Sequence, residues 1–258
     1  LGFQTIKKFS FFKKNEREYA IYQYLIGALI NHSVRKADKV IVQTDWMKEA
    51  VAGKAHVSPT KIAKILPDVE NLNQYKRPGV RKPNQFFFPS GVMIYKNHEC
   101  ILKACNILNQ KGITDFNVLF TLDSTESVTN YRYNNQYSNI TCDGRLTKEQ
   151  VLEAYNERTL IFPSYIETFG YPPAEARQLE APILASDTPF CREVLTDYPQ
   201  VNYFDPFSPE ELATLMEQAI NEMLPTATVA DNTNHSTTDS KKNKSPRDSW
   251  GEVLKELL

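Results

Sequence analysis

Residues 160–186, LIFPSYIETFGYPPAEARQLEAPILAS, decide the fold of this chain. The apolar run Leu160–Pro163 predicts a strand, and Pro172–Glu180 predicts a helix because proline is favoured in the first helical turn. Gly170 marks a tight turn between them, and Ile183–Ser186 predicts the next strand. A strand, a helix and a second strand in this order form a βαβ unit, which requires parallel strands.

The same alternation extends to both sides of this unit. Further strands are predicted at 86–88, 118–122, 139–142 and 201–204, and helices at 97–109, 147–157 and from 208 onwards. Two of these helices begin with capping boxes, Thr147-x-x-Gln150 and Ser208-Pro209-Glu210-Glu211. The pattern predicts an α/β fold with a doubly wound parallel sheet.

The first seventy residues contain fewer elements than a complete domain needs. Residues 16–37 predict a helix with one apolar face, 39–43 a strand, 44–51 a helix begun by Thr44, and 62–66 a second strand. Two strands cannot bury both faces of a parallel sheet. We therefore interpret 1–70 as the remnant of a Rossmann-like domain, and the start at Leu1 rather than Met as that of a fragment or processed piece.

Composition changes predict the remaining boundaries. Residues 71–84 are polar and basic, with two prolines and a glycine, and are expected to be a linker before a domain at 85–224. Residues 225–248 are almost devoid of apolar side chains and predict a flexible linker. A capping box and apolar residues at helical spacing predict a terminal helix at 249–258.

Charge and glycine usage exclude two classes of protein. The sequence has 30 Lys and Arg residues against 31 Asp and Glu residues, so it lacks the basic surplus that nucleic-acid binding requires. Its nine glycines are never closer than twelve positions apart, which excludes a G-x-G-x-x-G dinucleotide loop and a phosphate loop ending in G-K-[ST]. We expect no nucleic-acid partner.

Cysteine usage indicates a reducing compartment. The four cysteines show no C-x-x-C spacing: Cys100, Cys105, Cys142 and Cys191. Neither zinc nor a disulfide framework is expected, and a cytoplasmic location follows. No run of eighteen apolar residues occurs. Basic and aromatic residues at 7–14 are compatible with contact to the inner face of an anionic membrane, with an ordinary solvated charge run as the alternative.

Ligands of open α/β sheets bind beyond the carboxyl ends of the strands, and two such ends carry candidate residues. After the strand 86–88, Lys96 lies at a helix start, where its ammonium and the helix N–H groups suit a diphosphate. The alternative is a solvated surface lysine. For His98 an ordinary surface position is favoured over a general base.

The second strand end carries two carboxylates separated by seven residues. Glu167 is expected in the loop and Glu175 in the first turn of the next helix, both facing one cleft, where acceptor-only groups suit vicinal sugar hydroxyls. The N–H groups of Thr168, Phe169 and Gly170 suit an anion. Alternatively, Glu175 only favours the helix dipole and Glu167 is a solvated loop charge.

These stretches resemble a known family. FFFPSGVMIYKNHECILKA (86–104) and IFPSYIETFGYPPAEA (161–176) resemble the donor-binding half of group 1 (family 4) retaining glycosyltransferases of the GT-B fold. ADKVIVQTDWMKEAV (37–51) is similar to the segment that closes the acceptor-side domain of those enzymes. The terminal helix is similar to one that docks back on that domain.

The resemblance implies roles residue by residue. Lys96 would contact the donor diphosphate and Glu167, with the N–H groups after it, the transferred sugar; these two would be the catalytic residues. Glu175 would hold the ribose, and the backbone near Gly144 and Arg145 would flank the base. The implied partners are a nucleotide-diphosphate sugar and a saccharide or lipid-linked acceptor in cell-surface polysaccharide synthesis, with no cofactor and no metal.

The chain departs from the family pattern in two ways. Gly91 stands where many members carry an arginine, and the chain begins too late to contain the acceptor site. This chain is therefore expected to carry donor binding alone. One alternative is a non-catalytic nucleotide-sugar-binding module completed by a separate polypeptide, and another is an epimerase or phosphorylase of the same fold.

Overall fold

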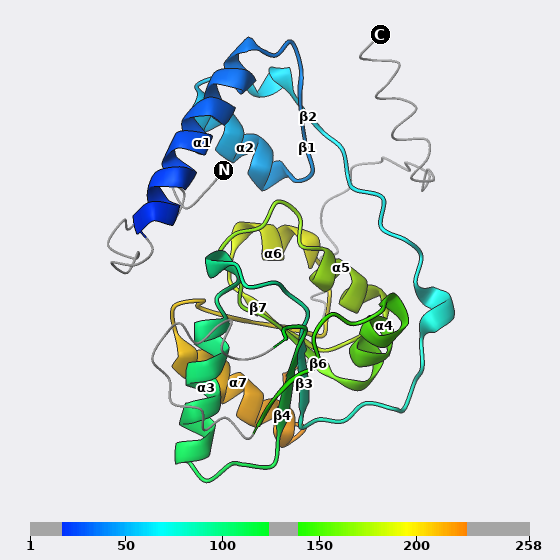
Figure 1. Ribbon diagram of the computed structural model, residues 1–258. Coiled ribbons are helices and arrows are strands. Elements are labelled where there is room, and N and C mark those ends of the chain that lie inside the picture. Colours follow the sequence, from blue (N-terminus) through cyan, green and yellow to red (C-terminus); the bar gives the residue numbers. More distant parts are fainter. Residues whose placement is uncertain (1–16, 124–138, 226–258) are drawn as a thin grey trace. The chain divides into compact units, whose positions relative to one another are not determined.

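The computed structural model describes residues 17–123 and 139–225, which form two compact units (Figure 1). The first unit contains residues 17–69 and 166–169, and the second contains 70–123, 139–165 and 170–225. The predicted terminal helix, the linker before it from residue 226 onwards, and the basic and aromatic stretch 7–14 lie outside the described residues.

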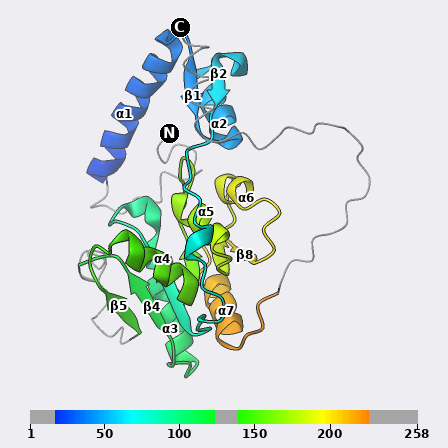
Figure 2. The same cartoon turned by 90° about the vertical axis from the view of Figure 1, so that its right-hand side faces the viewer.

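The second unit is built on one sheet of six parallel strands in the order β5-β4-β3-β6-β7-β8. Figure 2 shows β4 and β5, the pair at one side of this sheet, next to each other. The strands are β3 (Gln85–Phe88), β4 (Asn117–Phe120), β5 (Ile140–Cys142), β6 (Thr159–Phe162), β7 (Ile183–Ser186) and β8 (Val201–Phe204). The chain moves outward from β3 to β5, returns to pair β6 with β3, and moves outward again to β8. This confirms the predicted α/β class with a doubly wound parallel sheet.

Helices cover both faces of this sheet. They are α3 (His98–Gln110), α4 (Lys148–Glu157), α5 (Tyr171–Gln178), α6 (Pro189–Val194) and α7 (Pro209–Ile220). Successive side chains of a strand point to opposite faces. Phe88 packs against His98 of α3, whereas Phe87 packs against Tyr155 of α4, so these two helices lie on opposite faces. Helix α7 packs beside α3.

The capping signals are only partly realised. Thr147 forms the predicted capping box, in which its hydroxyl accepts from the Gln150 N–H at 3.3 Å and the Gln150 side chain accepts from the Thr147 N–H at 2.8 Å. Ser208 accepts from the Glu211 N–H, but the Glu211 carboxylate accepts from the Asp205 N–H instead of closing the box. The short helix α6 has no counterpart among the predicted elements.

Residues 71–84, the predicted linker, group with the second unit and are tied to α4 and α5. Leu72 is buried, and its N–H donates to the side chain of Gln178 at 3.0 Å. The Asn156 amide accepts from the Arg77 N–H at 2.8 Å and donates to the Tyr75 carbonyl at 2.9 Å. These bonds fix the path of the segment toward β3.

The first unit contains α1 (Arg17–Lys36), β1 (Val40–Val42), α2 (Asp45–Ala55) and β2 (Ile62–Lys64), with β1 and β2 paired in parallel. Its small core is formed by Val34, Val42, Val51, Ala52, Ala55 and Ile62. The apolar face predicted for α1 is not buried within this unit, since Leu25 and Leu29 are 57% and 67% exposed. No helix in the described part of the chain is long and apolar enough to cross a membrane.

The capping box of α4 yields a stability prediction. Thr147→Ala removes the hydroxyl that accepts from Gln150, and we expect it to lower the free energy of unfolding by about 1 kcal/mol. Urea denaturation followed by circular dichroism measures this loss. Thr147→Ser keeps the hydroxyl and is the control; equal losses in both variants would show that the cap contributes nothing.

Candidate functional site

The candidate site lies at the carboxyl ends of β3 and β6, where the strand order reverses. β3 and β6 are neighbours, but the chain continues from them toward opposite sides of the sheet. A crevice therefore opens between the loops that follow the two strands. In the second unit these loops are joined directly, because the Tyr165 N–H donates to the Tyr95 carbonyl at 2.9 Å. The structure therefore brings the segment of Lys96 next to the end of β6.

Lys96 ends a 3-10 turn, Ile94–Lys96, immediately before α3. Its ammonium lies 5.4 Å from the ring centroid of Tyr95, and the residue is half-buried. Asn97 follows in the left-handed conformation, with φ of 59°. Its buried amide donates to the carbonyls of Pro163 and Pro206, at 3.1 and 2.8 Å. This amide fixes the backbone that carries Lys96 to the carboxyl edge of the sheet.

His98 is not the surface residue expected from the sequence. It is 3% exposed, lies against the rings of Phe88 and Phe120, and shares a 2.8 Å hydrogen bond with the Ser90 hydroxyl. Burial, with a smaller contribution from the charge of Lys96, lowers the pKa of His98 to about 4. The imidazole is therefore neutral at neutral pH. Through its hydrogen bond to Ser90 it supports the loop of Lys96 from the core side. Its i-to-i+4 relation to Leu102 on the buried face of α3 was the missed signal.

Glu175 lies in the second turn of α5, not in the first as predicted. The helix begins at Tyr171, one residue before the predicted start, so Glu175 is its fifth residue. The half-buried carboxylate accepts a hydrogen bond from the Tyr155 hydroxyl at 3.1 Å. Burial raises the pKa of Glu175, and the Tyr155 hydrogen bond and the charge of Lys148 oppose this rise.

Tyr155 is a residue that the sequence analysis missed. It lies in α4, is 1% exposed, and packs edge-on against Phe87 of β3 with ring centroids 5.4 Å apart. A tyrosine on the inward face of a helix needs a buried partner for its hydroxyl. The capped helix 147–157 carried that signal, but only the tertiary structure shows that the partner is Glu175.

Glu167, Thr168 and Phe169 group with the first unit, so the structure describes them apart from Lys96 and Glu175. Within that unit the Thr44 hydroxyl donates to the Thr168 carbonyl at 3.0 Å, and Thr44 makes no side-chain cap to α2. Phe169 is buried and Glu167 is half-buried.

Gly170 belongs to the second unit and precedes the first residue of α5. Its φ of 94° is a conformation that side chains with a Cβ rarely adopt, which explains a glycine at this turn.

Gly144 and Arg145 follow β5, at the same edge of the sheet but two strands from β3. Gly144 has φ of 66°, and its N–H donates to the Leu122 carbonyl at 2.9 Å. A Cβ on this residue would lie 3.1 Å from the Asp123 carboxylate, so the loop is closely packed. Arg145 is exposed.

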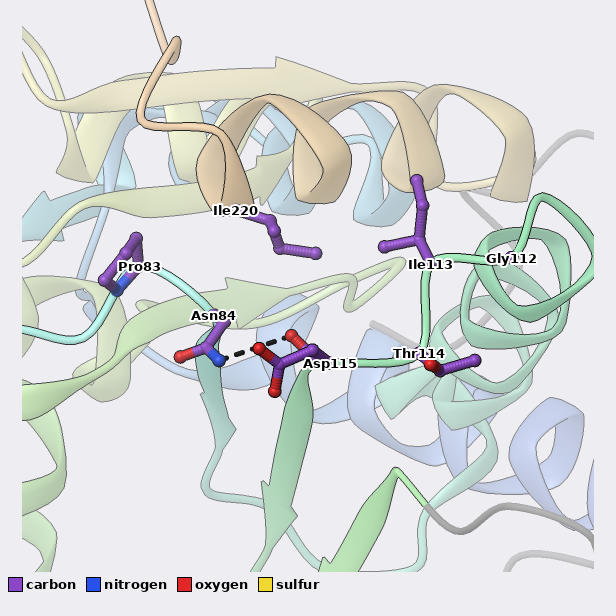
Figure 3. A pocket seen from close by; sticks show the side chains of 7 residues that line it. All are labelled: Pro83, Asn84, Gly112, Ile113, Thr114, Asp115 and Ile220. Carbon is purple, nitrogen blue, oxygen red and sulfur yellow. Dashed lines mark hydrogen bonds between the residues drawn. The ribbon is translucent and has the colours of Figure 1, made fainter.

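A pocket of about 440 Å³ lies near the amino ends of β3 and β4, whereas the candidate site lies at the carboxyl ends of the strands (Figure 3). It is lined by Pro83, Asn84, Gly112, Ile113, Thr114, Asp115 and Ile220. These residues precede β3 and β4 or end α7, and the Asn84 amide donates to the Asp115 carbonyl at 3.3 Å. The pocket therefore shares no residue with the candidate site.

Among the described residues, no group of three or more His, Cys, Asp or Glu side chains is arranged to hold a metal ion.

Comparison with known proteins gives a family match over 72–235, more than half of the chain, to the model described as glycosyl transferases group 1. O-antigen chain mannosyltransferase RfbU of Salmonella typhimurium is 25% identical over 181 residues, covering 66% of this chain and 48% of the relative. The chain thus spans about half the length of this curated relative.

Two solved structures show the same fold. A mutant of S. aureus TarM, in complex with Fondaparinux, alpha-GlcNAc-glycerol and UDP, has a TM-score of 0.60 at 14% identity, over 84% of this chain and 42% of that one. WaaG, a glycosyltransferase involved in lipopolysaccharide biosynthesis, has a TM-score of 0.58 at 16% identity, over 71% and 54%. These matches confirm the predicted GT-B type of fold.

The Asn97 contacts predict a graded loss of stability. Asn97→Gly keeps the left-handed backbone but leaves two buried carbonyls unpaired, and we expect a loss of about 2 kcal/mol. Asn97→Ala adds the strain of a Cβ at positive φ, about 1 kcal/mol more. Urea denaturation of both variants measures the difference, and an alanine variant as stable as the glycine variant would contradict the strain.

The buried neutral His98 predicts a pH dependence of stability. Its folded pKa is about 4, below the roughly 6.5 of an unfolded histidine. The unfolded state therefore gains a proton first as the pH falls from 6.5, and stability drops by about 3 kcal/mol until the folded pKa is passed. His98→Gln should lose less stability between pH 7.5 and 4.5 in urea denaturation. Parallel losses in the two proteins would contradict this assignment.

Proposed function

Because this chain belongs to the group 1 glycosyl transferases, we propose that the protein of which it is part or whole transfers a sugar, with retention, from a nucleotide-sugar donor. The proposed acceptor is a saccharide or lipid-linked saccharide in the synthesis of a cell-surface polysaccharide. The names of RfbU and WaaG support this process, and the UDP in the TarM complex supports a nucleoside diphosphate as the leaving group. The chain spans about half of RfbU, and donor binding is the part of the reaction that we assign to it.

One observation carries this assignment. The second unit has the Lys96 ammonium and the half-buried Glu175 carboxylate on the segments that follow the carboxyl ends of the paired strands β3 and β6. Lys96 precedes the N-terminus of α3, and its ammonium and the helix N–H groups suit the diphosphate. Glu175 is an acceptor-only group when ionised and suits the two ribose hydroxyls.

The family resemblance supports roles for further residues. Glu167 and the N–H groups of residues 168–170 would hold the transferred sugar, and the tight turn at Gly144 and Arg145 would flank the base. In a transfer with an oxocarbenium-like transition state, negative charge develops on the departing diphosphate. We assign the stabilisation of that charge to Lys96 and the helix N–H groups, without a divalent cation.

Two glutamate variants test this division of roles. Glu175→Ala should weaken both UDP and UDP-sugar binding, because it removes the acceptor for the ribose hydroxyls. Glu167→Ala should weaken only the UDP-sugar, because it contacts the sugar. Each loss should be about 1–3 kcal/mol, measured by isothermal titration calorimetry with the full chain, and GDP, ADP and their sugars are tested in parallel.

Glu153→Ala is the matched control, since Glu153 is an exposed carboxylate on α4. Binding in this variant should match the unchanged protein, with or without EDTA. Loss of binding in EDTA would contradict the metal-independent site, and equal effects of Glu167→Ala and Glu175→Ala on UDP would contradict the assigned roles.

A further inference from the structure

We propose that Tyr155 is a positioning residue for the donor site, whose hydroxyl orients the Glu175 carboxylate and keeps it ready to accept the ribose hydroxyls of a nucleotide-sugar. This inference rests on the proposed function and deepens it. It assigns to α4 a part in nucleotide recognition that follows from the Tyr155 to Glu175 contact.

The geometry makes Tyr155 a rigid support. Its ring is held edge-on against Phe87 at an interplanar angle of 69°, and Phe87 is a fully buried residue of the central strand β3. The hydroxyl reaches Glu175 Oε2 at 3.1 Å, from α4 to α5. A side chain that is locked by packing restricts the rotamers of the group it touches.

The choice of acceptor separates this contact from ordinary core packing. Tyr198 is also buried, but its hydroxyl donates to a backbone carbonyl, that of Ala181, at 2.7 Å. A carbonyl satisfies a buried hydroxyl without burying a charge. Tyr155 instead donates to a carboxylate, which is costly to desolvate unless it is hydrogen-bonded. Such an arrangement is expected where the carboxylate itself is needed.

One tyrosine donor leaves Glu175 able to bind a ligand. An ionised carboxylate has two oxygens, each with two acceptor sites, and Tyr155 occupies one of these four. The other oxygen and the second lone pair of Oε2 can accept from two vicinal hydroxyls. By fixing Oε2, Tyr155 sets the direction in which Oε1 is presented.

The charges around Glu175 determine how its ionisation responds to the hydroxyl. Burial and the Glu70 carboxylate, from the segment before β3, raise the pKa of Glu175, whereas Tyr155 and Lys148 of α4 lower it. Lys148 is also paired with Glu70. The pKa of Tyr155 is raised well above its ordinary value, chiefly by burial, so it remains a donor throughout the working pH range.

Removing the Tyr155 hydroxyl should therefore change the pKa of Glu175 in a definite direction. Without the Tyr155 donor the pKa of Glu175 rises further, and the carboxyl takes up a proton at a higher pH. A protonated carboxyl loses acceptor capacity. In each protein the nucleotide affinity is highest at high pH, where Glu175 is ionised, but in Tyr155→Phe this highest value is lower and the decline starts at a higher pH as the solution is acidified.

The experiment measures UDP affinity by calorimetry from pH 5 to pH 9 with the full chain, and repeats it with GDP or ADP if UDP is not the nucleotide bound. Tyr155→Phe should lower affinity about fivefold at pH 8, the effect of about 1 kcal/mol, and should move the acid limb of the profile to higher pH. Tyr198→Phe is the matched control, because it removes one buried tyrosine hydroxyl away from Glu175. Its profile should overlay that of the unchanged protein.

Two further variants separate the inference from the function on which it rests. Glu175→Gln cannot titrate, so its acid limb should be flattened, and adding Tyr155→Phe to it should move nothing further. If no nucleotide binds the unchanged protein, or Glu175→Ala binds as well as it does, the proposed function is wrong. If Glu175→Ala loses binding but Tyr155→Phe and Tyr198→Phe give the same profile, the function stands and the positioning role is wrong.

Should Tyr155→Phe unfold, the titration of Glu175 is followed instead in the unchanged chain and in Lys148→Ala. Carbon-13 chemical shifts of the glutamate carboxyls report the pKa directly. Loss of the Lys148 charge should raise the pKa of Glu175 while Tyr155 still donates. A Glu175 carboxyl that titrates like an exposed glutamate in the unchanged protein would overturn the proposal.

Discussion

The parallel pairing of β3 with β6 is the constraint on which the second unit depends. Residues more than seventy positions apart, such as Phe86 and Thr159, are brought into register by it, and the strand order reverses at this point. Both strands are almost completely buried, so their polar backbone groups must be satisfied within the sheet. The loops that follow them are then forced to the same edge.

The charged residues at that edge are supported by buried neutral donors and acceptors. Asn97 ties the backbone beside Lys96 to two carbonyls, and His98 and Ser90 hold the same loop from the core side. Tyr155 does the same for Glu175 from the opposite face of the sheet. Fully paired buried polar groups specify one arrangement, because each unpaired alternative is costly. The rigidity of the site therefore comes from the buried polar side chains of Asn97, His98 and Tyr155, and not from the charged groups themselves.

The first unit differs from the second in how much apolar surface it buries. Its core is small, and α1 presents a largely exposed apolar face within the described residues. A two-stranded parallel sheet buries little surface compared with the six strands of the second unit. Among the described residues, most of the buried apolar side chains therefore belong to the second unit, which carries Lys96 and Glu175.

The sequence alone determined the α/β class, the strand and helix alternation and the strand ends where Lys96 and Glu167 lie, because hydrophobic periodicity and turn residues are local signals. It did not determine that His98 is buried, that Glu175 lies in the second helical turn, or that Tyr155 contacts it. The position of Glu175 depends on where α5 begins, whereas the burial of His98 and the Tyr155 contact depend on which helix packs on which face of the sheet. A side chain's partner across that packing is set by tertiary contacts between segments distant in sequence, and no local pattern encodes them.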